Sequence, residues 1–205
     1  GELVAKWDAG SEEDEAEVLV AIAQTTGVHR LIVKLANDNA EAARYSVLPH
    51  EPRAATERDR DRVSAERTLA EGYELYSKSD QKSLRAAAKK YLAALEMFHS
   101  LGERGREARV LRALGDLYED LGEMPVALEY FNRMLSAAEA AGPLVQMGAL
   151  SRIGGFRASR FEYQKGLDYL EQALALARKL DDPLGQAVAL NNLAAIYGQV
   201  GIPFT

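Results

Sequence analysis

The side chains best suited to acid–base or metal chemistry are three histidines, His29, His50 and His99. They fall in an expected strand, a linker and an expected helix end, without the paired spacing that would hold a metal ion. No Gly-x-Ser-x-Gly turn or phosphate-binding loop occurs. The sequence contains no cysteine, so it offers no thiolate nucleophile and no thiolate metal ligand. We therefore expect no catalytic residue, no enzymatic activity, no metal and no cofactor.

Carboxylates gather between Glu12 and Glu17, which raises the question of a calcium site. Ca²⁺ takes about six to eight converging oxygen ligands, whereas a bare acidic run is usually a solvated loop. A solvated loop is the favoured interpretation, and calcium is the alternative. The alternating acidic and basic residues from Glu57 to Arg62 indicate a solvated helix face.

Composition describes a folded, helix-rich and mildly acidic protein. Of the 205 residues, 47% are hydrophobic, and the formal net charge is −6. The abundant alanine and leucine favour helix. A general nucleic-acid binder needs a basic surface, and no apolar run is long enough to cross a bilayer, so we expect neither nucleic acid nor membrane as a partner. The compartment is not fixed by the composition, although the cytoplasm is slightly favoured.

The first fifty residues differ from the rest because they contain short runs of β-branched and aliphatic residues. Gly, Asn and Asp separate these runs, which lie at Leu3–Trp7, Val18–Ala23, His29–Leu35 and Ala43–Leu48. Such spacing predicts an antiparallel meander. Four short strands are few for a self-contained sheet domain. We therefore expect residues 1–52 to be the C-terminal part of a larger β domain.

Helical periodicity begins after Pro52 and continues to the end of the chain. Thr56 is a predicted N-cap with Asp59 in an acidic variant of the capping box. The expected helices are Thr56–Ser77, Lys82–Leu101, Arg104–Leu121, Pro125–Ala141, Leu144–Phe161, Tyr163–Leu180 and Leu184–Val200. They form a domain over residues 53–205, with helix pairs at 53–102, 103–142 and 143–182 and an incomplete pair at 183–205.

One stretch of this domain recurs. Leu111–Gly122 comes back as Leu190–Gly201, about two forty-residue periods later. A fixed period of that size predicts stacked helix pairs, an architecture that usually presents surfaces.

The recurring residues resemble the tetratricopeptide repeat (TPR). Its Leu-x-x-Leu-Gly core and following Tyr, with a small residue and an aromatic in the second helix, are matched by Leu111, Leu114, Gly115, Tyr118, Ala127 and Phe131. Other copies are filled by Gly72, Ala87 and Tyr91, by Leu150, Ile153 and Gly154, and by Leu190, Leu193, Ala194 and Tyr197. The resemblance implies a mainly α-helical TPR-type solenoid behind a small antiparallel β element.

The long period and the Asn-Asn-Leu-Ala phrase resemble TPRs of kinesin-light-chain type. They are still more similar to arrays in large bacterial proteins that end in a caspase- or separase-like CHAT protease domain. There, an N-terminal β element precedes a helix like Ser83–Leu95. This resemblance implies a segment of a larger bacterial protein, which could be the regulatory region of a protease whose catalytic domain is absent from this sequence.

The third helix pair departs from the repeat pattern. Arg157, Arg160 and Phe161 stand where the pattern has Tyr, Leu and Gly. Either the packing adjusts locally, which we favour, or these arginines reach a groove or an acidic partner.

In a TPR solenoid the first helix of each pair lines the concave face. Counting from the Gly/Ala position places the following residues there: Arg109, Arg112, Asp116 and Glu119, then Ser151, Arg152, Gly155 and Ser159, then Asn191, Asn192, Ala195 and Gly198. In similar TPRs the residue at Asn192 hydrogen-bonds the backbone of an extended peptide, because an amide both donates and accepts. The arginines would favour acidic groups. Alternatively, Arg109, Arg112 and Arg152 pair with neighbouring acids and bind nothing.

These observations favour a non-catalytic module that binds a peptide or a neighbouring domain in its concave groove. The peptide-binding candidates are Arg109, Arg112, Asp116, Ser151, Arg152, Asn191 and Asn192. The alternative is self-assembly as a scaffold through the last helix. Its apolar face lacks a following helix to cover it, and this face is expected to comprise Leu190, Leu193, Ile196 and Tyr197.

Overall fold

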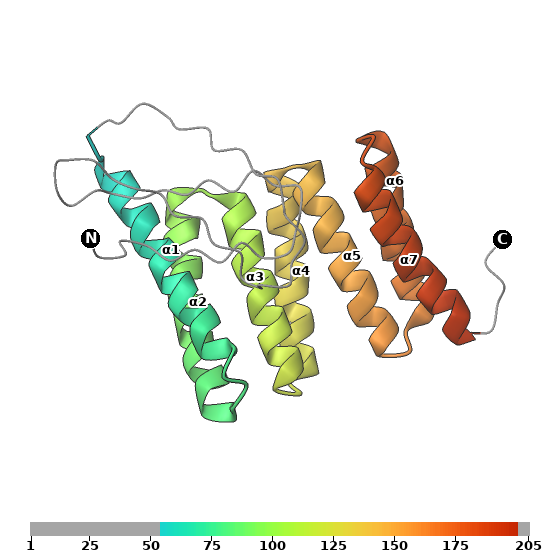
Figure 1. Ribbon diagram of the computed structural model, residues 1–205, viewed down its shortest axis with the longest axis horizontal. Helices are drawn as coiled ribbons and strands as arrows, with labels where there is room; N and C mark the ends of the chain where they lie inside the picture. The colour runs from blue at the N-terminus through green and yellow to red at the C-terminus, as the bar shows by residue number, and fades with distance from the viewer. Residues whose placement is uncertain (1–53, 201–205) are drawn as a thin grey trace, which may run out of the picture.

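The computed structural model describes residues 54–200, which form α-helices joined by short turns (Figure 1). The helices are α1 (Glu57–Tyr76), α2 (Gln81–Leu101), α3 (Arg104–Asp120), α4 (Met124–Ala141), α5 (Pro143–Ser159), α6 (Tyr163–Lys179) and α7 (Pro183–Val200). All begin and end within two residues of the predicted bounds. Residues 54–200 contain no strand, and the β element predicted for residues 1–52 lies outside the described residues.

The ends of the first two helices show how the sequence sets these bounds. At the start of α1 the backbone N–H of Asp59 donates to Oγ1 of Thr56, and the N–H of Thr56 donates to a carboxylate oxygen of Asp59. This is the predicted capping box. Asp80 caps α2 by accepting from two backbone N–H groups. Gly102 ends α2 at a φ of 69°, a left-handed conformation that glycine adopts without strain.

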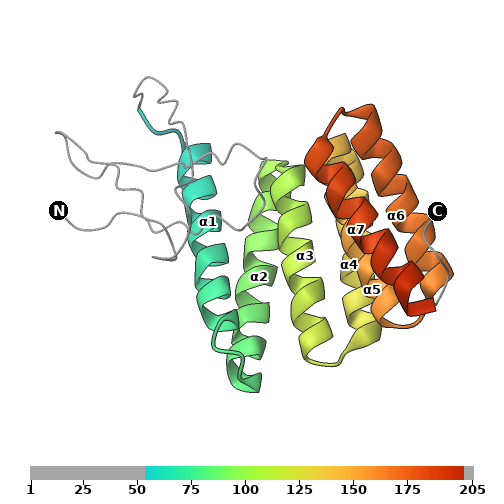
Figure 2. The ribbon, with the colours of Figure 1, turned by 45° about the vertical axis from the view of Figure 1, so that its right-hand side comes forward.

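Each helix packs against the next one along the chain, and the pairs stand side by side in sequence order (Figures 1 and 2). Beyond these neighbours, α3 also contacts α5, and α5 contacts α7. The odd-numbered helices therefore lie close together in one layer, with the even-numbered helices behind them. We call the surface of α1, α3, α5 and α7 the inner face. This is a mainly α-helical solenoid built from adjacent helix pairs.

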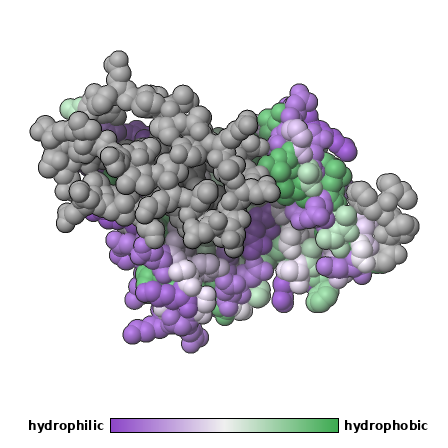
Figure 3. All heavy atoms as spheres, viewed as in Figure 1, coloured by the Kyte–Doolittle hydropathy of each residue, from purple (hydrophilic) through white to green (hydrophobic). Residues whose placement is uncertain are grey.

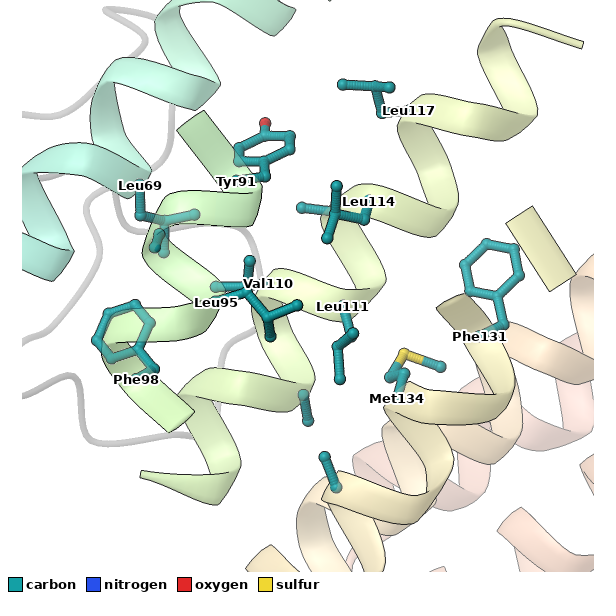
Figure 4. Packing of buried hydrophobic residues seen from close by; sticks show 14 of the residues in the cluster. Leu69, Tyr91, Leu95, Phe98, Val110, Leu111, Leu114, Leu117, Phe131 and Met134 are labelled. Carbon is teal, nitrogen blue, oxygen red and sulfur yellow. The ribbon is translucent and has the colours of Figure 1, made fainter. Parts of the chain in front are cut away.

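Small residues let the two helices of a pair approach each other closely. Gly115 of α3 lies against the ring of Phe131 of α4, where a Cβ atom would collide with the ring. Gly72 stands in the same relation to Tyr91 of α2. These aromatic rings are almost completely buried. Figure 4 shows them among the large side chains that fill the space between α2, α3 and α4, together with Leu114.

The prediction that the apolar face of the last helix is uncovered was wrong. Leu193 and Ile196 are buried, and they belong to a core cluster shared with α5 and α6. The reason is that α7 contacts both of these helices, so the side that was expected to be uncovered faces them. The large apolar side chains that α7 exposes instead include Leu184 and Val188, at 41% and 44%. No helix within residues 54–200 is long and apolar enough to cross a membrane.

Candidate partner-binding face

The predicted site residues all lie on odd-numbered helices. Helix α3 carries Arg109, Arg112 and Asp116, α5 carries Ser151 and Arg152, and α7 carries Asn191 and Asn192. Each of them is partly or fully exposed to solvent. The inner face thus presents these side chains on three neighbouring helices, but it brings only some of them into contact.

A charged cluster joins α3 to α5. Nε of Arg152 donates to Oδ1 of Asp116 at 2.7 Å, and Nη2 of Arg152 donates to Oε2 of Glu119. The other oxygen of Asp116 lies 3.7 Å from Nε of Arg112. The Arg152 guanidinium also lies over the Phe131 ring, 4.5 Å from its centroid, in cation–π geometry. These contacts cross from one repeat to the next, so they stabilise the stacking of helix pairs.

The same side of the solenoid contains a hydrogen bond between α1 and α3. The Tyr76 hydroxyl donates to Oδ2 of Asp120 at 2.5 Å. Burial raises the pKa of Tyr76, and the neighbouring carboxylate of Asp120 raises it further. The hydroxyl therefore remains a proton donor over the whole physiological pH range. Polar side-chain contacts therefore connect α1 to α3 and α3 to α5.

Burial also acts on the charged cluster. It raises the pKa of Asp116, and the guanidinium of Arg152 opposes this rise by stabilising the carboxylate. Burial alone would lower the pKa of Arg152, but the carboxylates of Asp116 and Glu119 outweigh it and raise the pKa. Arg152 therefore stays charged and already has two carboxylate partners. Arg112 faces Asp116, and Arg109 also has an interaction within the chain.

Three uncharged polar side chains of the inner face, Ser151, Asn191 and Asn192, differ from the charged cluster. Within residues 54–200, Ser151, Asn191 and Asn192 make no side-chain hydrogen bond to another residue. Asn191 is exposed, and Asn192 is partly exposed. Their donors and acceptors are therefore open to a ligand or to water.

Sequence reasoning missed the apolar part of this face. Leu184, Val188 and Asn191 follow one another at helical spacing, so they lie on one side of α7. Leu144 occupies on α5 the place that Leu184 has on α7, and it is also exposed. Figure 3 shows hydrophobic residues gathered over α5 and α7, with hydrophilic ones beside them. The signal in the sequence was the Pro-Leu pair that opens both helices.

The third helix pair, which departs from the repeat pattern in sequence, shows a local adjustment at Arg157. Its guanidinium donates to Oε2 of Glu162 at 2.7 Å, within the turn that joins α5 to α6. Phe161 in that turn has a φ of 61° and is 80% exposed. The equivalent residue of the preceding repeat is Gly122, whose φ is 75°. The turn therefore keeps its left-handed conformation even though glycine is absent.

Among residues 54–200 no group of three or more His, Asp or Glu side chains is placed to hold a metal ion. No protein-family model matches the chain, and no curated protein matches it. One similar solved chain is described as the crystal structure of BtubC (BKLC) from P. vanneervenii. The two share 16% identity over 71% of this chain and 67% of that one, with a TM-score of 0.42. A likeness at this level carries no argument about function.

Proposed function

We propose that this chain is a TPR-type, non-catalytic protein–protein interaction module that binds an extended peptide along its inner face. The observation that carries the proposal is that α7 exposes amide and apolar side chains close to each other. The amides of Asn191 and Asn192, which have no hydrogen-bond partner in the described part of the chain, lie at helical spacing from the exposed Leu184 and Val188. An extended peptide offers backbone groups for the amides and alternate side chains for the apolar residues.

The charged cluster favours an extended ligand over an acidic one. A ligand carboxylate at Arg152 would have to displace Asp116 or Glu119, and it would leave that carboxylate partly buried without its partner. Asn192 requires no such exchange. We therefore propose that the backbone and apolar side chains of the peptide supply most of the affinity, while the arginines shape the face on which it lies.

Peptides selected on the wild-type chain from a displayed library provide the ligand for the test, and fluorescence anisotropy provides the affinity. Asn192→Ala and Val188→Asp should each weaken binding about tenfold or more, because a desolvated hydrogen bond and an apolar contact are lost. Asn132→Ala is the matched control, since Asn132 is an exposed residue of the even-numbered helix α4. Equal affinities for all three variants would place the ligand elsewhere.

The exposed apolar residues of α7 also support the alternative, in which the module assembles with itself or with a neighbouring domain of a larger bacterial protein, such as one of CHAT type. Leu184 and Val188 could pack on a second copy. Sedimentation across a range of concentrations distinguishes the two cases. A chain that remains monomeric while it binds peptide supports the first proposal.

A further inference from the structure

A row of three cations lies on α2, an even-numbered helix that does not form part of the inner face. Lys82, Arg85 and Lys89 are spaced by three and four residues, which places them on one side of the helix. All three are exposed. Together with Gln81 and Ala86 they line a shallow depression in the surface. We call Lys82, Arg85 and Lys89 the basic row.

The basic row has no counter-charge within the described residues. None of its three side chains forms an ion pair or a hydrogen bond with any of them. Lys90, the next residue on the same helix, shows the contrast, because its ammonium lies 2.5 Å from a carboxylate oxygen of Glu71.

The acidic residues that flank the basic row in the sequence, Asp80 before α2 and Glu96 within it, do not neutralise the row. Asp80 accepts hydrogen bonds from the backbone N–H groups of Lys82 and Ser83 and from the Ser83 hydroxyl, so it serves as the helix cap. Glu96 lies about 10 Å further along the axis than Lys89, at 1.5 Å per residue.

The repeat itself does not require cations at these positions. Ala87 of α2 corresponds to Ala127 of α4 and to Gly166 of α6 by their shared place opposite the preceding helix. By the same count, the basic row corresponds to Gly122, Pro125 and Glu129 in the second pair and to Phe161, Gln164 and Asp168 in the third. The basic row is therefore particular to α2, in a chain whose formal net charge is −6.

We propose that the basic row docks an acidic segment of a partner protein. Like charges at this spacing destabilise a helix by about 0.2–0.5 kcal/mol per pair, and bound carboxylates would relieve that repulsion. The row spans about 10 Å along α2, which matches three carboxylates on one side of a partner helix. Leu92 continues the same side one turn beyond Lys89 and is 37% exposed, so it offers the partner an apolar contact.

The size of the row argues against the other polyanions. Proteins that bind duplex DNA through its backbone typically neutralise about 6–10 phosphates, and recognition of anionic lipid takes clusters of about 4–8 basic residues. Three cations on an acidic protein fall short of both, whereas three carboxylates on a peptide balance them.

The test uses a synthetic helical peptide with glutamates at i, i+3 and i+7 and a leucine one turn beyond the last glutamate. Its companion has the same composition, but its glutamates are spread around the helix. Binding to the full chain is measured by fluorescence anisotropy at low and moderate salt. We expect the first peptide to bind at least tenfold more tightly than its companion, and its affinity to fall as salt screens the charges.

Arg85→Glu and Lys89→Glu should each weaken binding about tenfold or more, with helix content unchanged by circular dichroism. Lys179→Glu is the matched control, because Lys179 is an exposed cation of α6 with no ion pair among the described residues. The proposal is overturned if both peptides bind alike, if neither binds, or if the control weakens binding as much. Tighter binding to anionic vesicles or duplex DNA than to the first peptide would also overturn it.

Discussion

Replacing Arg152 with glutamine tests whether the charged cluster of the inner face stabilises the solenoid. Glutamine keeps part of the aliphatic stem but removes the guanidinium, which lies over the Phe131 ring. Glu119 then loses its partner in the cluster, and Asp116 keeps only the more distant Arg112. The expected result is a lower free energy of unfolding, because two partly buried carboxylates lose the charge that compensates for their desolvation.

The burial of the cluster sets the size of the effect. Exposed ion pairs contribute about 0–1 kcal/mol, whereas removing one partner of a fully buried pair costs about 3–5 kcal/mol. The side chains of Arg152 and Asp116 are 24% and 29% exposed, so they lie between these limits. We expect Arg152→Gln to lower the free energy of unfolding by about 1.5–2.5 kcal/mol at neutral pH.

The loss should depend on pH in a defined direction. Burial raises the pKa of Asp116, and removing Arg152 takes away a cause that lowers it, so this pKa rises further in the variant. A carboxyl with a raised folded-state pKa stabilises the fold below its unfolded-state pKa, and this contribution is lost as the pH rises through the folded-state pKa. The difference between wild type and variant is therefore smallest in acid and largest above the folded-state pKa of Asp116.

Urea unfolding followed by circular dichroism measures these energies. Arg152→Gln, Asp116→Asn and the double variant complete a double-mutant cycle. We expect a coupling energy of about 1 kcal/mol or more at neutral pH that shrinks in acid. A coupling near zero, or one that does not change with pH, would refute the argument that this pair stabilises the contact between α3 and α5.

Three further predictions concern single positions. Gly122→Ala should lower the free energy of unfolding by about 1–2 kcal/mol in urea unfolding, because the φ of 75° is strained for alanine although nothing lies within 4 Å of the added Cβ. Gly115→Ala should lower the melting temperature as its Cβ meets the Phe131 ring, whereas Gly155→Ala, in open space on α5, should raise the melting temperature. Val188→Lys should reduce any self-association seen by sedimentation; an unchanged association constant would show that the contact lies elsewhere.

The helices and their ends followed from the sequence because local chemistry determines them. Thr56 and Asp59 form a capping box without help from the rest of the fold. Pro143 and Pro183 open their helices, where a missing N–H costs nothing. The regular return of Gly and Leu then showed which helix faces must meet.

The contacts between repeats were harder to predict, because they depend on which side of a helix its neighbours cover. Helix α7 has apolar residues on two sides, one with Leu193 and Ile196 and the other with Leu184 and Val188. Its own sequence does not say which side faces α5 and α6. Similarly, the period placed Arg152 and Asp116 on one face, but their pairing depends on the separation of α3 and α5.

The side chains of the inner face differ between its two ends. We infer that α1, α3 and α5 stabilise the solenoid, whereas α7 binds the ligand. From α1 to α5 it is held by side chains that already have partners, namely Tyr76 with Asp120 and Arg152 with Asp116. On α7 the amides of Asn191 and Asn192 have no hydrogen-bond partner among residues 54–200, and apolar side chains are exposed beside them. A ligand on α7 gains contacts without breaking any, whereas a ligand on α3 must first displace an ion pair. Variants of Asn192 should therefore change affinity with little effect on stability, and variants of Arg152 should do the reverse.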